Sequence, residues 1–150
     1  MNQLGARSPG LVGAAVTNGA LHAGLIADGI HVHPAAITAA WRAKEAPGAL
    51  FLVSDAMAVA GSDLTSFTLN GRKITRRDGR LTLADGTLAG ADLDLTTAIR
   101  VLVEQADVPL DEALRAAVTT PARLIGQPAS CDEFIGQPLE RFIRIRHDLT

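Results

Sequence analysis

The sequence contains very little cysteine and few aromatic residues. Cys131 is the single cysteine among 150 residues, and aromatic residues make up only 3% of the chain. One cysteine excludes an internal disulfide and a zinc site built from cysteines, and it fits a reducing compartment. With so few aromatic side chains, a hydrophobic core has to be built mainly from leucine, valine, isoleucine and alanine.

The sequence also lacks a run of basic residues and a long apolar stretch. The formal charge is −2, which argues against nucleic acid or an anionic membrane as the main partner. The longest apolar stretches are interrupted at Thr17, Asn18, His22 and Asp28, so no segment is expected to span a bilayer. No basic-then-apolar signal pattern opens the chain, and we therefore expect a cytoplasmic protein of one domain's length.

What the chain does contain is a short apolar run that leads directly into two polar residues. Residues 50–53 are Leu-Phe-Leu-Val, and Ser54 and Asp55 follow. An unbroken apolar run of this length is typical of a strand buried on both faces, as in parallel sheets. Residues just past such a strand face the ligand crevice of α/β folds, which makes Asp55 a candidate catalytic residue. The alternative is that Ser54 or Asp55 only caps the following turn.

A second strand is predicted from Leu21 to Ala27, and it runs into a segment with two histidines. His31 and His33 are two residues apart, so on an extended backbone both side chains point to the same side and could share a metal ion. No carboxylate or third histidine follows at ligand spacing. The other interpretation places one histidine in a site and lets the other cap the next helix, because Pro34 suits a first helical position.

The two predicted strands are joined by an alanine-rich segment, residues 34–46, whose apolar residues recur at three- and four-residue steps. This spacing predicts a helix with one apolar stripe, which Pro47-Gly48 ends. A strand, a helix and a strand in this order predict a βαβ unit with parallel pairing and a right-handed crossover.

Arg7 lies in a loop rich in glycine and proline, residues 5–10. A guanidinium in such a loop could fork onto a carboxylate or a phosphate. The alternative is a solvated surface arginine, since most arginines are exposed. An apolar segment of small residues follows from Leu11 to Val16.

After residue 61 the sequence pattern changes to short strands joined by tight turns. Asn-Gly and Asp-Gly pairs at residues 70–71, 78–79 and 85–86 predict an antiparallel patch over residues 64–84. Residues 87–91, Thr-Leu-Ala-Gly-Ala, form a small-residue loop by composition. Such a loop either lets a ligand approach backbone amides closely or serves only as a linker.

Helical segments complete the regular part of the chain. Apolar periodicity predicts helices at residues 93–106 and 111–118, and residues 120–126 are expected to form a short third helical turn. Residues 127–150 do not match this pattern, and within them residues 141–147 alternate apolar and basic side chains. That run is expected to form either an edge strand with its charges outward or a disordered tail.

Four motifs in register resemble N-acetylglucosamine-6-phosphate deacetylases, which are metal-dependent amidohydrolases. The motifs are residues 5–10 (Gly-Ala-Arg-Ser-Pro-Gly), 24–32 (Gly-Leu-Ile-Ala-Asp-Gly-Ile-His-Val), 52–56 (Leu-Val-Ser-Asp-Ala) and 85–91 (Asp-Gly-Thr-Leu-Ala-Gly-Ala). The closing Thr120-Pro121-Ala122 and Ile125-Gly126 fit as well. The resemblance covers about residues 1–126 in order, and four motifs together are far more specific than any one of them.

The resemblance implies an α/β fold, the C-terminal portion of an amidohydrolase-type (β/α)₈ barrel with part of a small antiparallel β domain, followed by helices. By this match, residues 1–61 hold the last strands and helices of the barrel, and residues 62–92 hold the antiparallel hairpins and a substrate loop. Residues 93–126 form the C-terminal helices. Residues 127–150 depart from the family's pattern, and we expect a divergent tail translated in a shifted frame.

The resemblance also implies roles for individual residues. Asp55 is implied to be the general base for a metal-bound water and then the acid for the leaving amine. Arg7 and His31 are implied to hold the sugar's phosphate, with the arginine reaching across a homodimer interface. By this match His31, and not His33, is the functional histidine. Backbone contacts to the substrate are implied for three residues, Ala89, Gly90 and Ala91.

The implied cofactor is a divalent metal of the zinc or iron class, but no residue of this chain matches the family's ligands, which lie upstream of Met1. The implied reaction is hydrolysis of the N-acetyl amide of N-acetylglucosamine 6-phosphate to glucosamine 6-phosphate and acetate, in amino-sugar catabolism. We expect the function to belong to a longer enzyme and this chain alone to be inactive. The alternatives are another amidohydrolase, dihydroorotase-like or dipeptidase-like, or an inactive truncated fragment.

Overall fold

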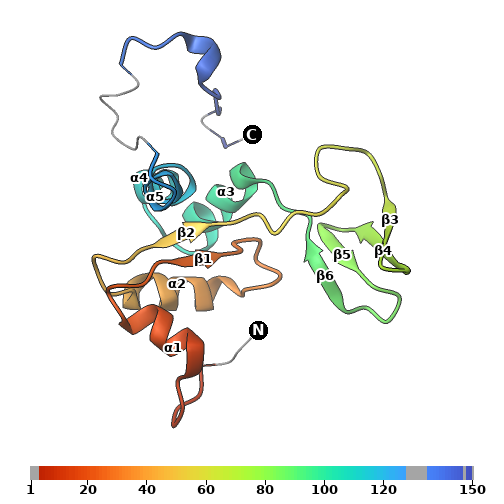
Figure 1. Cartoon of the computed structure of the whole chain (residues 1–150), viewed down its shortest axis with the longest axis horizontal. Helices are drawn as coiled ribbons and strands as arrows, with labels where there is room; N and C mark the ends of the chain where they lie inside the picture. Colours follow the sequence, from red (N-terminus) through yellow and green to blue (C-terminus); the bar gives the residue numbers. More distant parts are fainter. Residues whose placement is uncertain (1–3, 128–134, 147, 150) are drawn as a thin grey trace.

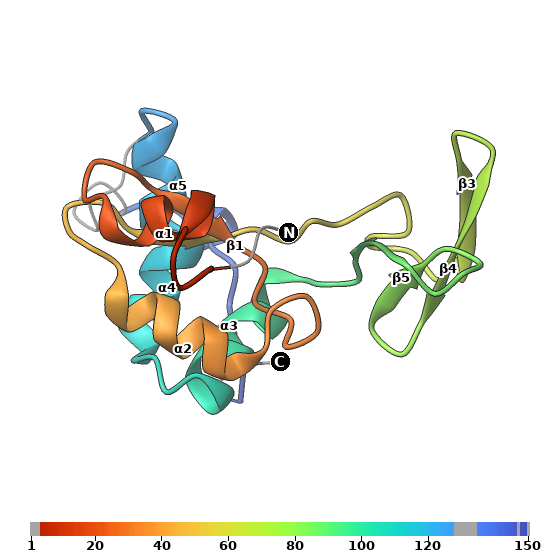
Figure 2. The same cartoon turned by 90° about the horizontal axis from the view of Figure 1, so that it is seen from below.

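The computed structural model describes residues 4–127, 135–146 and 148–149, and these residues form two parts. One part is an α/β unit that contains a two-stranded parallel sheet and the α-helices. The other part is a four-stranded antiparallel sheet that extends away from the α/β unit (Figures 1 and 2). The mixture of helices and strands confirms the predicted α/β class.

The α/β unit is built around a βαβ unit, as predicted. Strand β1 (Ala23–Leu25) pairs in parallel with β2 (Leu50–Leu52), and helix α2 (Pro34–Ala43) lies between them in the chain. The register places the last residues of the two strands, Leu25 and Leu52, opposite each other. Both strands are shorter than predicted, and α2 ends at Ala43 rather than at residue 46.

One side of the parallel sheet packs against the C-terminal helices α3 (Leu95–Gln105), α4 (Leu110–Ala117) and α5 (Thr119–Leu124). Helices α4 and α5 contact β2, and α3 contacts α2. The resulting core contains the leucines of both strands together with Ile37 and Leu102. The three predicted helical segments are confirmed, with ends that differ by one or two residues.

The opposite side of the sheet is more open than the sequence predicts. Gly24 is exposed and Phe51 is half-buried, whereas Leu50 and Leu52 are buried. Successive side chains of a strand point to opposite faces, and the described helices cover only one of them. The prediction that this strand is buried on both faces is therefore wrong for the described residues.

The apolar segment of small residues forms helix α1 (Gly10–Thr17), an element whose type the composition left open. Thr17 ends this helix by donating its hydroxyl hydrogen to the Gly13 carbonyl oxygen at 2.9 Å. The turn after α1 lies against the segment that leads into β2, where the Gly48 N–H donates to the Gly19 carbonyl oxygen at 2.6 Å. This contact sets where β2 begins relative to β1.

We expect Gly48→Ala to lower the free energy of unfolding by about 3 kcal/mol, the upper end of the range for overpacking. A Cβ at this position would overlap the Leu21 carbonyl oxygen and lie 2.9 Å from the Gly19 carbonyl oxygen, and backbone atoms cannot rotate away. Gly71→Ala is the control, because its Cβ would meet no atom within 4 Å and the cost, about 1 kcal/mol, comes from the positive φ alone. Urea denaturation measures the free energy of unfolding of both variants, and an equal decrease for Gly48→Ala and Gly71→Ala would refute the steric argument.

The antiparallel patch is confirmed as a sheet of four strands in sequence order. Its strands are β3 (Ser66–Leu69), β4 (Arg72–Arg77), β5 (Arg80–Thr82) and β6 (Leu88–Ala91). One face carries its own small core of Val59, Ile74 and Leu81, against which Ala89 and other partly buried residues pack.

Two of the three predicted hairpin turns have the expected geometry. Asn70 and Gly71 have φ values of 49° and 76°, and Asp78 and Gly79 have φ values of 50° and 71°, as two-residue mirror turns require. The third turn differs, because Gly86 has a φ of 83° but Asp85 does not adopt a positive φ. There the Leu83 N–H donates to the Thr87 carbonyl oxygen at 2.9 Å, which closes a three-residue loop instead.

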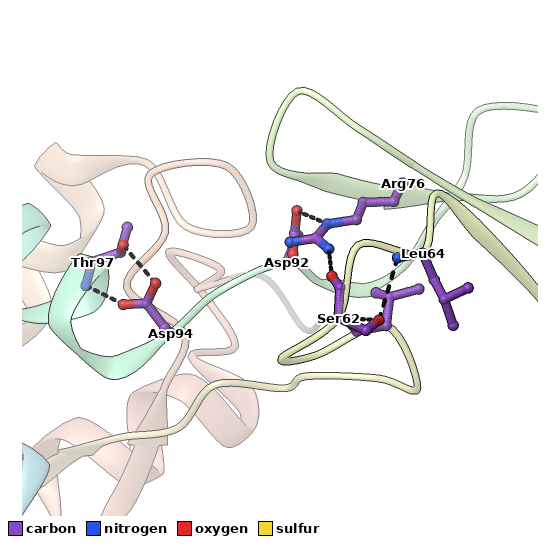
Figure 3. A network of polar contacts seen from close by, with 7 residues as sticks. Ser62, Leu64, Arg76, Asp92, Asp94 and Thr97 are labelled. Atoms are coloured by element: carbon purple, nitrogen blue, oxygen red, sulfur yellow. Dashed lines mark hydrogen bonds and ion pairs between the residues drawn. The ribbon is translucent and has the colours of Figure 1, made fainter.

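Two connections join the antiparallel sheet to the α/β unit, and Arg76 links them (Figure 3). Arg76 Nε donates to Asp92 Oδ2 at 2.7 Å, and its Nη1 donates to the Ser62 carbonyl oxygen at 2.6 Å. Ser62 lies on the connection that leaves β2, and Asp92 lies on the connection that returns to α3. On the returning side, Asp94 caps α3 by accepting from the Thr97 N–H at 2.7 Å.

The residues after α5 contain little regular structure in the described part of the chain. Leu139–Arg141 form a single 3₁₀ turn, and residues 141–146 form no strand, so the edge-strand prediction is wrong there. Leu149 is buried in the core of the α/β unit, and its carbonyl oxygen accepts from Arg100 Nη2 at 3.1 Å. Cys131 and His147 lie outside the described residues.

The longest helix in the described part of the chain is α3, with 11 residues. None of the helices within residues 4–127, 135–146 and 148–149 has the length and apolar content that a crossing needs.

Candidate functional site

The carboxyl ends of β1 and β2 lie at the same edge of the parallel sheet. The Val53 N–H donates to the Leu25 carbonyl oxygen at 3.1 Å, which continues the pairing just past β2. The segments that leave this edge carry Asp28 and His31 after β1 and Asp55 after β2. Two of the predicted site segments therefore emerge side by side, as parallel strands require.

Asp28 and His31 form a side-chain pair at this edge. Asp28 Oδ2 lies 2.6 Å from His31 Nδ1, and Asp28 Oδ1 accepts from the backbone N–H groups of Ile30 at 2.9 Å and of His31 at 2.8 Å. The two side chains are only 5% and 15% exposed. Burial raises the pKa of Asp28, but the hydrogen bonds from His31 and Ile30 outweigh burial and hold that pKa below its ordinary value. Asp28 is therefore a carboxylate at neutral pH.

The lowered pKa of Asp28 makes a pH-dependent contribution to stability. Because the group is more acidic in the folded chain, its contribution is fully present above the unfolded pKa of about 3.9 and is lost as the pH falls through the lower folded value. We expect the free energy of unfolding of the wild type to fall more steeply below about pH 4 than that of Asp28→Asn, which does not titrate. Urea titrations across this range measure the two slopes, and equal slopes would disprove the linkage.

His33 has a structural position instead. It is the N-cap of α2, where its Nδ1 accepts from the Ala35 N–H at 3.1 Å and Pro34 occupies the first helical position. The capping interpretation of the histidine pair is confirmed. The shared-metal interpretation gains no support, because each ring uses its Nδ1 on a different local partner.

We expect His33→Ala to lower the free energy of unfolding by about 1 kcal/mol, the usual cost of losing an N-cap. His33→Asn is the matched control, since asparagine is among the best capping residues and should keep most of this stability. Thermal or urea denaturation measures both variants. An asparagine variant no more stable than the alanine variant would show that capping is not what His33 contributes.

Asp55 lies at the surface with a positive φ of 49° and an exposed side chain. Its carbonyl oxygen accepts from the Ala91 N–H at 3.0 Å, while its carboxylate bonds to no other described residue. The turn after β2 is capped by Ser54 instead, whose Oγ accepts from the Ala56 N–H at a long 3.4 Å. The capping alternative therefore applies to Ser54, and the Asp55 carboxylate is directed to solvent.

Residues 89–91 lie in strand β6, so the loop that composition predicts is wrong. Ala89 is half-buried, and Gly90 is part of the ladder between β5 and β6. The Ala91 N–H is already bonded to Asp55, so this amide is not free for a substrate. A Cβ on Gly90 would lie 2.6 Å from Met57 Sδ, and close packing therefore accounts for the glycine. What β6 does provide is a fixed backbone next to Asp55.

Arg7 is exposed in the loop before α1. Among the described residues, its guanidinium forms no hydrogen bond or ion pair with another side chain. Within one chain Arg7 is thus bonded neither to the Asp28–His31 pair nor to Asp55.

The described residues do not supply a metal site by themselves. Within residues 4–127, 135–146 and 148–149, no three His, Cys, Asp or Glu side chains gather closely enough to hold an ion. Asp28 and His31 are two potential donors that are already bonded to each other, short of the three or four protein ligands of zinc sites. A metal does not fit these residues alone.

Asp28 is the residue at this site that the sequence analysis missed. A local signal was present, because an aspartate followed by glycine commonly accepts from backbone amides two and three residues on. The contact with the His31 ring follows from that turn, since it folds the chain back over the carboxylate.

The sequence is similar to proteins named as deacetylases of amino-sugar phosphates, although no family profile matches it. It is 41% identical over 128 residues to the N-acetylgalactosamine-6-phosphate deacetylase of a Shewanella species, covering 85% of this chain and 32% of that protein. It is 40% identical over 127 residues to a putative N-acetylgalactosamine-6-phosphate deacetylase of Escherichia coli, covering 84% of this chain and 74% of that protein.

The fold is similar to that of a solved relative. The N-acetyl-D-glucosamine-6-phosphate deacetylase of Mycobacterium smegmatis, in complex with N-acetyl-D-glucosamine-6-phosphate, superposes with a TM-score of 0.74 at 30% identity. The match covers 86% of this chain and 35% of that one. The chain thus spans about a third of the Shewanella and Mycobacterium proteins but three quarters of the one from Escherichia coli. By these similarities, the chain belongs to the family of N-acetylhexosamine 6-phosphate deacetylases.

Proposed function

We propose that this chain is the C-terminal part of an enzyme that hydrolyses the N-acetyl amide of N-acetylglucosamine 6-phosphate to glucosamine 6-phosphate and acetate. In this proposal residues 1–61 belong to the last strands and helices of a (β/α)₈ barrel. Residues 62–92 form the antiparallel domain, residues 93–126 form the C-terminal helices, and residues 127–150 form a divergent tail. The parallel β1–β2 pair with α2 and α3 outside it supports this assignment.

The observation that carries the proposal is the position of Asp55. It is a solvent-directed carboxylate at the carboxyl end of β2, next to the strand end from which Asp28 and His31 emerge. Ligands of α/β folds bind at this end of the strands. Its backbone is fixed by the bond from Ala91, and its carboxylate stays available for a substrate.

In the proposed reaction Asp55 moves a proton twice. Its carboxylate accepts a proton from the water that attacks the amide carbonyl carbon, forming a C–O bond. The resulting carboxylic acid then donates this proton to the nitrogen as the C–N bond breaks, so that the amine and acetic acid are released. The acetic acid passes its own proton to the amine, which gives acetate and an ammonium group. Asp55 returns to its starting form, and atoms and charges balance.

Recognition of the 6-phosphate is assigned to His31 and Arg7. An arginine forks onto phosphate oxygens and a histidine adds one more donor, which provides binding energy away from the reacting bond. We assign Arg7 to the site of a second copy in a homodimer because the resemblance to the deacetylases implies it, and an exposed guanidinium is available for such a contact. Contact of the substrate with residues 89–91 is restricted to groups other than the Ala91 amide.

The cofactor follows from the family and not from the described residues. We propose a divalent metal of the zinc or iron class, held by ligands outside the described residues. We also propose a cytoplasmic enzyme that acts on small sugar phosphates and has no nucleic-acid or membrane partner. The single cysteine fits a reducing compartment, and the net charge of −2 argues against nucleic acid or an anionic membrane as a partner.

N-acetylgalactosamine 6-phosphate is the second candidate substrate. The relatives at 41% and 40% identity are named for this sugar, whereas the solved relative named for N-acetylglucosamine 6-phosphate is 30% identical. The two sugars differ only in the configuration of one ring hydroxyl, and the same amide and phosphate chemistry serves both.

A chimera tests the proposal, with this chain replacing the matching 128 residues of the Shewanella deacetylase. We expect acetate release from at least one of the two hexosamine 6-phosphates, and the ratio of their kcat/KM values selects between the two candidates. The unphosphorylated sugars should react far more slowly. A folded chimera that releases no acetate from either phosphate would overturn the proposal, and this chain alone should be inactive.

A further inference from the structure

The Asp28–His31 pair is arranged so that one ring nitrogen is occupied and the other is not. Asp28 Oδ2 lies 2.6 Å from His31 Nδ1, a short contact, as charge-assisted hydrogen bonds are. Among the described residues, none forms a hydrogen bond with the Nε2 atom of this ring. The ring is 15% exposed, so part of it meets solvent at the edge where the strands end.

Both oxygens of Asp28 are committed to this arrangement. Oδ1 accepts from the backbone N–H groups of Ile30 and His31, which fixes the plane of the carboxylate relative to the backbone that carries the imidazole. Oδ2 is then left to face Nδ1. With a side chain only 5% exposed, Asp28 does not exchange these partners for water. It is a rigid acceptor, and a rigid acceptor determines which ring nitrogen carries the proton.

We propose that Asp28 is a positioning residue that keeps a proton on His31 Nδ1 and thereby presents Nε2 to the anionic group of the substrate. This inference rests on the proposed function, because it deepens the phosphate-binding role of His31. When Nδ1–H of an imidazole donates to a carboxylate, Nε2 can donate to a phosphate oxygen only if it carries a second proton. The ring is then a cation between two anions, with one charge-assisted hydrogen bond to each.

Asp28→Asn is a nearly isosteric test of this role. The asparagine carbonyl oxygen can keep the two bonds from Ile30 and His31, so the local turn is retained. Its NH₂ group replaces Oδ2 and donates to Nδ1, which moves the ring proton to Nε2 and disfavours the doubly protonated ring. The variant therefore changes the proton on His31 while changing the turn little.

The ring proton is measured directly by long-range ¹H–¹⁵N correlation spectra of this chain without any ligand. We expect the His31 signals of the wild type to be those of a ring protonated at Nδ1, and those of Asp28→Asn to be those of a neutral ring protonated at Nε2. A wild-type ring that is neutral and protonated at Nε2 would overturn the inference. The wild-type spectrum alone tests this point, so the test does not depend on whether the variant folds.

The consequence for binding is measured in the Shewanella chimera as KM for the preferred hexosamine 6-phosphate and for its unphosphorylated sugar. We expect Asp28→Asn to raise KM for the phosphate about tenfold, the difference between a charged and a neutral hydrogen bond, with kcat nearly unchanged. In a His31→Gln background the same change should add nothing, because Asp28 acts through the ring. Equal effects of Asp28→Asn in both backgrounds would disprove the positioning role.

The same set of variants separates failure of this inference from failure of the proposed function. If His31→Gln raises KM for the phosphate and Asp28→Asn does not, His31 binds phosphate without help from Asp28 and the inference is wrong. If His31→Gln leaves the phosphate preference unchanged, the assignment of His31 in the proposed function is wrong. The inference that Asp28 assists phosphate binding is then wrong as well.

Discussion

Asp55→Asn should abolish most of the deacetylase activity of the Shewanella chimera while leaving substrate binding intact. The amide cannot accept a proton from the attacking water, and losing a positioned general base costs about 10²- to 10⁴-fold in kcat. The Asp55 carbonyl oxygen keeps its bond from Ala91, and asparagine tolerates the φ of 49°, so the fold should be unaffected. Acetate release under saturating substrate measures kcat, and KM is taken from the same titration.

Asp107→Asn is the matched control for this prediction. Asp107 is also an exposed aspartate at a positive φ of 57°, and with the described residues it forms one ion pair, a long 3.8 Å contact with Arg42 at the surface. It follows α3 and does not lie at the carboxyl edge of the parallel sheet. This variant should keep the kcat of the unmodified chimera. Comparable kcat values for the two variants would remove Asp55 from the mechanism.

Arg7→Ala should raise KM for the 6-phosphate about tenfold to a hundredfold and leave KM for the unphosphorylated sugar unchanged. Loss of a charged hydrogen bond to phosphate accounts for a change of this size, and a sugar without phosphate offers the guanidinium nothing to bind. Arg42→Ala is the control, because Arg42 is an equally exposed arginine on α2. A similar rise of KM for both sugars would show that Arg7 does not recognise phosphate.

The assignment of Arg7 to a second copy is tested by mixing two variants of the chimera that are each impaired at substrate concentrations well below KM. In a heterodimer of Arg7→Ala and Asp55→Asn, one of the two sites has both residues intact if the arginine comes from the other protomer. Activity should therefore recover on mixing and subunit exchange. No recovery, with heterodimers shown to form, would place Arg7 in the site of its own chain.

The elements that rest on local chemistry could be predicted from the sequence. Asn70-Gly71 and Asp78-Gly79 define two hairpins because their residues tolerate positive φ, and the apolar run after Pro47-Gly48 marks β2. Parallel pairing followed from the spacing of strand, helix and strand alone. The placement of Asp55 at the carboxyl edge was a consequence of that topology.

Features that depend on contacts distant in the chain could not be predicted in the same way. Residues 87–91 resemble a loop by composition, but residues 88–91 form a strand because β5 offers a partner and Asp55 accepts from Ala91. Arg76 gives no local sign that it joins Ser62 to Asp92. The second face of β2 remains half open because the described helices cover only one side of the sheet.

The Asp28–His31 pair lies between these two cases. The backbone bonds of Asp28 follow from a local turn, but the 2.6 Å contact with the ring depends on how that turn is oriented after β1. The resemblance to the deacetylases implies that His31, and not His33, is the functional histidine, and the two rings have different partners in the structure. His33 is used as the N-cap of α2, while His31 is held by a buried carboxylate at the edge of the sheet.

The central claim is that Asp55 and His31 act on one ligand across the carboxyl edge of two parallel strands. A crystal structure of the Asp55→Asn chimera, soaked with the preferred hexosamine 6-phosphate, tests it most directly, because slow turnover preserves the intact amide. We expect the acetamido group next to residue 55 and a phosphate oxygen within hydrogen-bond distance of His31 Nε2. An ordered substrate whose amide or phosphate lies elsewhere would contradict it.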